Sequence, residues 1–287
     1  MKINGATKIF GVCGNPVKHS FSPQMHNFLF NKFKLNGIYL PFEIQKEKFK
    51  DFINGMRNIT NIVGLNITIP FKNEAFEVAD VLSDEAKVIG SINTLYFKGE
   101  RIYGYNTDTY GFLKAIKINY PDFKFEGKNI LLLGAGGVSK SILYSLIISN
   151  VRKIYIVNRT LKRAEKLCDY FSEKMYFNDI EVLPLDFNIL KNINDKIDVI
   201  INSTSIGLKK DDPLLIKLSG NIELVYDIIY NPPETKLLSE AKKLNINVLN
   251  GLDMLILQGV KSFEIWNNLH NISNNSEILR DLHKIFK

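Results

Sequence analysis

The sequence has few residues of the kinds that mark secreted, metal-binding or membrane-spanning proteins. Two of its 287 residues are cysteine, Cys13 and Cys168, and they fit neither a disulfide framework nor the spacing of metal ligands. The longest apolar runs, such as Ile130–Leu133 and Leu146–Ile148, are far too short to cross a bilayer, and no signal-peptide stretch follows Lys2. We therefore expect a cytoplasmic protein with free thiols, no bound metal and no membrane partner.

Charge is not concentrated in any block of the sequence. The chain has 37 Lys and Arg against 30 Asp and Glu, a net charge of +7, but the basic residues are scattered. They form no basic stripe interleaved with aromatic residues, so the sequence argues against a nucleic-acid partner. A mild positive field instead suits small anionic ligands such as carboxylates and phosphates.

The order of predicted elements indicates an α/β chain with two domains. Short apolar runs alternate with helical patterns, which predicts parallel sheets covered by helices. We place one α/β domain over residues 1–105 plus 252–287, because the apolar face of the last helical region needs a surface to cover, and a second domain over residues 106–251. Ser22, followed by Pro23, is the predicted cap of the first helix. The predicted strands are Lys8–Cys13, Gly37–Phe42, Ile62–Ile69, Asn129–Leu133, Lys153–Val157, Ile197–Asn202 and Leu224–Ile228, and the predicted helices are Pro23–Leu35, Lys46–Arg57, Val138–Ser149, Leu161–Phe171 and the region Leu252–Lys287.

A glycine-rich segment joins a strand to a helix in the second domain. Its residues are Gly134, Ala135, Gly136, Gly137, Val138 and Ser139. The first glycine allows a tight turn, the second lets the main chain approach a pyrophosphate, and the helix start offers free N–H groups. This context is typical of a Rossmann domain, a doubly wound dinucleotide-binding fold. Because Ser139 replaces the third glycine, a glycine-rich turn without a ligand remains an alternative.

The end of the next strand favours NADP over NAD. An NAD-binding chain usually has an acidic residue here, which accepts a hydrogen bond from the ribose. This chain instead has Asn158, Arg159 and Thr160, followed by Arg163. Arginine binds a phosphate through two parallel hydrogen bonds, so these residues suit the 2′-phosphate of NADP. The alternative is a solvated arginine at a helix start.

Polar residues interrupt a strand of the first domain that ought to be apolar. Asn66 and Thr68 lie two residues apart and therefore point to the same face. Lys72 follows at the start of a predicted helix, where the N-terminus disfavours a protonated amine, as a catalytic base requires. Polar segments recur at 90–94, 104–108 and 254–259. Each segment, taken singly, is also compatible with a turn or with a paired core polar group.

Taken together, these motifs resemble the shikimate dehydrogenase family over nearly the whole chain and in the right order. Two positions depart from the family pattern: Ser91 stands where alanine is usual, and Asp253 stands where a small residue is common. Neither is a catalytic position. The segments that carry the resemblance are Gly14–Val17 with His19–Pro23, Asn66–Lys72, Gly104–Asp108, Asn202–Gly207, Tyr226–Pro232 and the segment around Gln258.

The resemblance implies an NADP-dependent oxidoreductase that interconverts 3-dehydroshikimate and shikimate, for aromatic amino acid (chorismate) biosynthesis. It implies that Lys72 is the acid–base group and Asp108 its partner. Two alternatives stay open: a quinate/shikimate dehydrogenase, and a non-catalytic NADP-binding sensor, against which the Lys72–Asp108 pair argues. A homodimer is a candidate state that the sequence does not decide. The implied substrate-binding residues are Ser20, Ser22, Asn66, Thr68, Lys72, Asn93, Asp108, Tyr230 and Gln258, and the implied cofactor-binding residues are Asp84, Gly134–Val138, Asn158, Arg159, Thr160, Arg163, Ile228 and Gly251.

Overall fold

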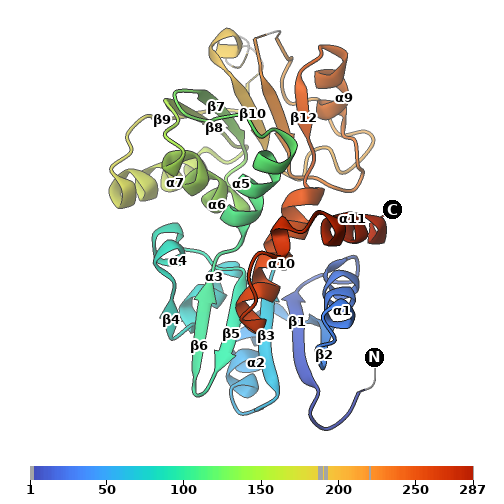
Figure 1. The fold of residues 1–287 in the computed structure, drawn as a ribbon. Coiled ribbons are helices and arrows are strands. Elements are labelled where there is room, and N and C mark those ends of the chain that lie inside the picture. The colour runs from blue at the N-terminus through green and yellow to red at the C-terminus, as the bar shows by residue number, and fades with distance from the viewer. Residues whose placement is uncertain (1–2, 187–189, 191–192, 220, 287) are drawn as a thin grey trace. The chain divides into compact units, whose positions relative to one another are not determined.

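The computed structural model describes residues 3–186, 190, 193–219 and 221–286, which form two compact units, each with its own six-stranded sheet (Figure 1). The first unit contains Met1–Gly111 and Ile256–Lys287, and the second contains Phe112–Leu255. The divisions fall within helices α5 (Asp108–Asn119) and α10 (Leu252–Asn267), and the domain limits drawn from the sequence stay a prediction. Among the described residues, no helix has the length and apolar character needed to cross a membrane.

The sheet of the first unit is mixed, with strand order β2-β1-β3-β5-β6-β4. β1 pairs in parallel with β2 and β3, whereas β5 is antiparallel to both β3 and β6. The alternation of strands and helices predicted a parallel sheet and missed the β5–β6 hairpin. That hairpin turns at Gly99 and Glu100, and Gly99 has a φ of +61°, which favours glycine. The strands are β1 (Lys8–Gly14), β2 (Gly37–Glu43), β3 (Ile62–Ile67), β4 (Val81–Leu82), β5 (Thr94–Lys98) and β6 (Arg101–Tyr105).

Helices cover both faces of this sheet, and the alternation of side chains along β3 decides which residues meet which helix. Leu65 belongs to the apolar cluster that contains Phe49 of α2. Gly64 points the other way, against Trp266 of α10, and a Cβ atom at Gly64 would lie 2.3 Å from the indole Nε1. Asn66 shares the face of Gly64 and therefore meets α10 as well. The helices of this unit are α1 (Ser22–Lys32), η1 (Lys46–Lys48), α2 (Phe49–Met56), α3 (Lys72–Val78), α4 (Asp84–Ile89), η3 (Ile272–Asn274) and α11 (Ser276–Ile285), with the greater part of α10.

One expectation about a helix end is wrong in this unit. Ser22 is not the cap of α1: Phe21 occupies that place, and the hydroxyl of Ser20 accepts from the Ser22 N–H at 3.3 Å. The C-terminal region is helical, as expected, and consists of α10, which ends at Asn267, the short η3, and α11, which begins at Ser276.

The sheet of the second unit is wholly parallel, with strand order β12-β11-β10-β7-β8-β9. The chain enters at β7, runs outward through β8 to β9, and then returns to β10 beside β7. This is the doubly wound Rossmann order, and ligands of such sheets bind beyond the carboxyl ends of the two strands where the order reverses. The elements are β7 (Asn129–Leu133), α6 (Gly137–Ile148), β8 (Lys153–Val157), α7 (Leu161–Met175), β9 (Ile180–Leu183), η2 (Asn194–Lys196), β10 (Val199–Asn202), β11 (Leu224–Asp227), α9 (Lys236–Lys243) and β12 (Asn247–Leu249).

Candidate active site and cofactor site

A lysine and an aspartate form an ion pair in the first unit. Lys72 is the first residue of α3, Asp108 is the first residue of α5, and the Lys72 Nζ pairs with the Asp108 Oδ2. The side chains are 16% and 8% exposed, respectively. Such a pair is weakly screened by solvent, so removal of one partner leaves the other charge poorly compensated.

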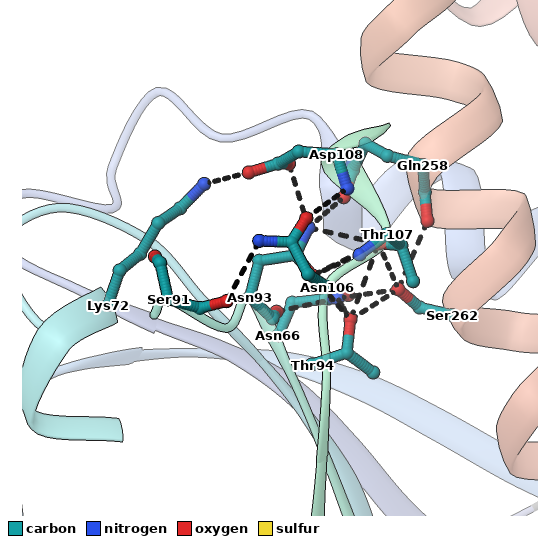
Figure 2. Close-up of polar contacts among 10 residues, drawn as sticks. All are labelled: Asn66, Lys72, Ser91, Asn93, Thr94, Asn106, Thr107, Asp108, Gln258 and Ser262. Atoms are coloured by element: carbon teal, nitrogen blue, oxygen red, sulfur yellow. Dashed lines mark hydrogen bonds and ion pairs between the residues drawn. The ribbon is translucent and has the colours of Figure 1, made fainter. Parts of the chain in front are cut away.

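The second carboxylate oxygen of Asp108 is held by Asn93 (Figure 2). The Asn93 Nδ2 donates to the Asp108 Oδ1 at 2.8 Å and to the Gln258 Oε1 at 3.1 Å. The Asn93 Oδ1 accepts from the Thr107 main-chain N–H at 2.9 Å, which fixes the amide in one orientation. Asn106 holds the start of α5, since its Oδ1 accepts from the Asp108 N–H at 3.1 Å. Asp108 is therefore positioned with one oxygen on an amide and the other on Lys72.

A cluster of buried hydroxyl groups lies beside these amides. Thr94, Thr107 and Ser262 bring their side-chain oxygens within 2.8 to 3.4 Å of one another. The Asn66 Nδ2 donates to the Ser262 Oγ at 2.9 Å, which joins β3 to α10 (Figure 2). Sequence reasoning missed Thr94, Thr107 and Ser262 as parts of this network. Thr94 and Thr107 lie in the polar segments 90–94 and 104–108, but neither was assigned a role of its own. Ser262 is a single polar residue in a largely apolar helix, and such residues are common in satisfied cores.

The structure thus brings Asn66, Lys72, Asn93, Asp108 and Gln258 into one network, and the roles that the resemblance implies for them stay predictions. Thr68 follows the end of β3 with a half-buried side chain, and Ser20 and Ser22 lie at the start of α1, where Ser22 is buried.

Ser91, one of the two departures from the family pattern, is fully buried. Its hydroxyl has no hydrogen-bond partner among the described residues, an arrangement that costs about 1–3 kcal/mol. Asp253, the other departure, accepts from the Asn119 Nδ2 at 2.7 Å.

The predicted cofactor loop occupies the strand-to-helix turn after β7. Gly134 has a φ of +107°, and a Cβ atom there would lie 2.7 Å from the Ser203 Oγ, so the position requires glycine. Gly136 is the N-cap of α6 and is exposed, and a Cβ atom there would meet nothing within 4 Å. The main chain therefore leaves open space at the start of a helix, where N–H groups and a partial positive charge suit a pyrophosphate.

Two serines brace this loop from behind. The Ser139 Oγ accepts from the Gly136 N–H at 2.8 Å and lies 2.9 Å from the Ser203 Oγ. Ser203 in turn donates to the Leu133 main-chain oxygen at 2.7 Å. Ser139, in the place of the third fingerprint glycine, thus acts as a side-chain cap of α6, and Ser203 ties the ends of β7 and β10 together.

The residues after β8 fit a phosphate. The Asn158 Oδ1 accepts from the Ala135 N–H at 3.2 Å, which fixes the end of β8 against the glycine loop. Arg159 and Arg163 are exposed, and in the part of the chain that the structure describes neither is in an ion pair. Two exposed guanidinium groups without an ion-pair partner among the described residues match the 2′-phosphate chemistry for which the sequence argued.

Four further predicted ligand-binding residues are Ile228, Gly251, Tyr230 and Asp84. Gly251 packs on the main chain of Ile228 in the second unit, where a Cβ atom would come within 1.8 Å of the Ile228 oxygen. Tyr230 follows β11 in the same unit, and burial raises the pKa of its phenol. Asp84 lies in the first unit with a fully exposed side chain that pairs with Lys87 at 2.8 Å. The roles of these residues stay predictions.

The fold and the two clusters define a class of two-unit α/β proteins, in which a Rossmann unit accompanies a unit with a polar site built on a Lys–Asp pair. Residues 12–95 match the family model of the shikimate dehydrogenase substrate-binding domain, and residues 116–209 match that of shikimate / quinate 5-dehydrogenase. The chain belongs to the shikimate dehydrogenase family.

Individual relatives agree over nearly the full length. A shikimate dehydrogenase (NADP(+)) from Aquifex aeolicus is 41% identical over 92% of this chain and 93% of its own. One from Methanococcus vannielii is 40% identical over 96% and 97%, respectively. A crystal structure of a shikimate dehydrogenase in complex with NADP+ is 38% identical, with a TM-score of 0.88 over 100% of this chain and 98% of its own.

Proposed function

We propose that this chain is an NADP-dependent shikimate dehydrogenase, an oxidoreductase that interconverts 3-dehydroshikimate and shikimate in the biosynthesis of chorismate and the aromatic amino acids. The observation that carries the proposal is the Lys72–Asp108 pair, held by Asn93 and Gln258, in a chain of this family. A purely sensory NADP-binding protein has no need of a group that transfers protons, so this pair favours an enzyme.

Lys72 transfers the proton. In the reduction of 3-dehydroshikimate, the carbonyl oxygen must gain a proton, and the Lys72 ammonium donates it. In the oxidation of shikimate, the neutral Lys72 amine takes the proton from the hydroxyl. Asp108 orients Lys72 through Oδ2, while Asn93 restrains Oδ1 and keeps the carboxylate from turning away.

The remaining residues of the first unit bind the substrate. Asn66, Thr68, Asn93 and Gln258 meet the ring hydroxyls, and Ser20 and Ser22 meet the carboxylate. Support comes from the hydrogen-bond network that joins Asn66 to Asn93 and Gln258, and from the place of the two serines at the start of α1, where helix N–H groups favour an anion. Tyr230, in the second unit, is a further proposed substrate-binding residue.

The second unit binds NADP, whose reduced form would supply the hydride in the reduction and whose oxidised form would accept it in the oxidation. Gly134–Val138 accommodate the pyrophosphate, and Asn158–Arg163 accommodate the adenosine 2′-phosphate, for which the open main chain at Gly136 and the unpaired guanidinium groups give support. Ile228 and Gly251 border the nicotinamide, with Asp84 nearby. We also infer a cytoplasmic enzyme, because its two cysteines are free, and a homodimer as its state in solution.

The decisive experiment is an assay of the purified protein. Shikimate or quinate is mixed with NADP or NAD, and the absorbance of the reduced cofactor is followed. We expect rapid reduction with shikimate and NADP. Binding of NADP without turnover of either acid would refute the enzyme and favour the sensor.

A further inference from the structure

The Asn66 amide is enclosed by protein groups on both of its ends. Its Nδ2 lies 2.9 Å from the Ser262 Oγ, 3.2 Å from the Thr94 Oγ1 and 3.3 Å from the Asn93 main-chain oxygen. Its Oδ1 accepts from the Tyr39 phenol at 2.8 Å. Asn66 is 7% exposed, so little of the amide is free for a ligand.

The main-chain oxygen of Asn93 decides which way the amide points. A carbonyl can only accept a hydrogen bond, so the nitrogen of Asn66 must face it, and a flipped amide would set two oxygens against each other. The two N–H groups of Asn66 then face three acceptors of the protein. The Asn66 Oδ1 keeps a second lone pair, which can meet only a group that donates, and the His26 ring is a neighbour of this amide.

Tyr39 is the residue that holds this oxygen. Its phenol is 1% exposed, and its ring stacks on the His26 ring with centroids 4.2 Å apart and planes 7° apart. The main chain of Tyr39 is also fixed, because Asn27 accepts from its N–H and donates to its oxygen, both at 2.9 Å. The phenol is therefore held in place, where its hydroxyl donates to Asn66 and also interacts with Ser22.

We propose that Tyr39 is a positioning residue that fixes the Asn66 Oδ1 as a hydrogen-bond acceptor for a ring hydroxyl of the substrate. This inference rests on the proposed function, since it assigns Tyr39 a part in the recognition of shikimate. Tyr39 acts through Asn66 and does not take part in the reaction. The oxygen that reacts is a carbonyl in 3-dehydroshikimate, and a carbonyl cannot donate a hydrogen bond to the Asn66 Oδ1. An acceptor at this place therefore selects one of the hydroxyls that 3-dehydroshikimate and shikimate both have.

The variant Tyr39→Phe removes only the phenol oxygen. We expect it to raise the KM for shikimate by about tenfold, the loss of about one ordinary hydrogen bond, and to lower kcat by less than about threefold. The KM for NADP should not change. A KM for shikimate within about twofold of wild type, by the same arithmetic, would overturn the proposal.

The matched control is Tyr226→Phe. Tyr226 is a second fully buried tyrosine, and its hydroxyl has no hydrogen-bond partner among the described residues. Its loss should leave both KM values within about twofold of wild type, since no bond is broken. An equal rise of the shikimate KM in Tyr226→Phe would show that the loss of a buried phenol acts generally, and would overturn the proposal.

A double-mutant cycle separates positioning from a merely structural role. In the Asn66→Ala background, Tyr39→Phe should change the shikimate KM by less than about twofold, because the amide through which Tyr39 acts is gone. The same tenfold rise in both backgrounds would contradict the inference.

Asn66→Asp tests the orientation without a change at Tyr39, and it serves if Tyr39→Phe fails to fold. Its carboxylate must set an oxygen against the Asn93 main-chain oxygen, so it should raise the KM more than Asn66→Ala does; a lower KM would overturn the argument. If wild-type protein does not turn over shikimate, the proposed function fails first, and the cycle is run with the acid that it does use.

Discussion

Replacement of Lys72 by alanine tests the proposed proton transfer most directly. General acid–base groups contribute about two to four decades in rate, which is about 3–5 kcal/mol of barrier, so kcat should fall by that factor. The KM for shikimate should change much less. The Asp108 carboxylate, 8% exposed, loses its cation but keeps the Asn93 Nδ2, so the variant should also lose about 1–3 kcal/mol of stability.

Two further variants separate proton transfer from charge. Lys72→Arg keeps a cation beside Asp108 but cannot release its proton near neutral pH, so it should regain stability and not activity. Lys50→Ala removes a lysine of the same unit whose pair with Glu77 is 55% and 59% exposed, and it should leave kcat unchanged.

The assay is steady-state absorbance of the reduced cofactor with shikimate and NADP, with thermal unfolding as the measure of stability. A Lys72→Ala protein that is folded and keeps more than about a tenth of wild-type kcat would refute the assignment of Lys72 as the acid–base group.

Three other outcomes are expected. Arg159→Ala should raise the KM for NADP by about one to two decades, the value of a charge-assisted phosphate contact, and leave that for NAD nearly unchanged; equal losses would show that Arg159 does not bind the 2′-phosphate. Quinate carries an extra hydroxyl beside the carboxylate, for which Ser20 and Ser22 offer no evident partner, so its kcat/KM with saturating NADP should be at least about tenfold lower than that of shikimate; equal or better use of quinate would contradict this. Burial lowers the pKa of His26 from 6.5 to about 3, so below pH 6.5 the ring binds a proton in the unfolded state and not in the folded state. The free energy of unfolding therefore decreases as the pH falls below 6.5. The unfolding temperature of wild type should therefore drop between about pH 6.5 and 5, above the range of ordinary carboxylates, and that of His26→Phe should drop less.

The sequence predicted the second unit more closely than the first. β7 and β8 begin and end where the apolar runs do, at Asn129–Leu133 and Lys153–Val157, because strands buried on both faces are continuous apolar segments. In the first unit, β5 and β6 were not predicted. Polar residues of the site stand directly before β5 and directly after β6. Segments 90–94 and 104–108 were therefore interpreted as turns, and the antiparallel pairing of β5 with β6, in which Leu95 lies opposite Gly104, was not predicted.

The candidate site was predicted through its motifs, and the groups that support it were not. Lys72 and Asp108 were expected as partners, and the structure pairs them. Tyr39 and Ser262 lie 27 and 196 residues from Asn66 in the chain, and no local pattern links them to it. These partners are brought to Asn66 by the register of β2 beside β1 and by the packing of Trp266 on Gly64. Both are tertiary contacts, which no local sequence pattern predicts.

Three positions proposed to bind or supply an anion lie at the start of a helix. Ser22, Asp108 and Gly137 are each the first residue of a helix of eleven or twelve residues, where unpaired N–H groups and a partial positive charge favour anions. At α1 and α6 the anion would come from the ligand, a carboxylate or a pyrophosphate. At α5 the protein itself supplies the anion, the side chain of Asp108. That carboxylate in turn holds the Lys72 ammonium at the start of α3, where a lone cation would be disfavoured. The charge of the Lys72 ammonium is thus compensated by Asp108 in a nearly buried site.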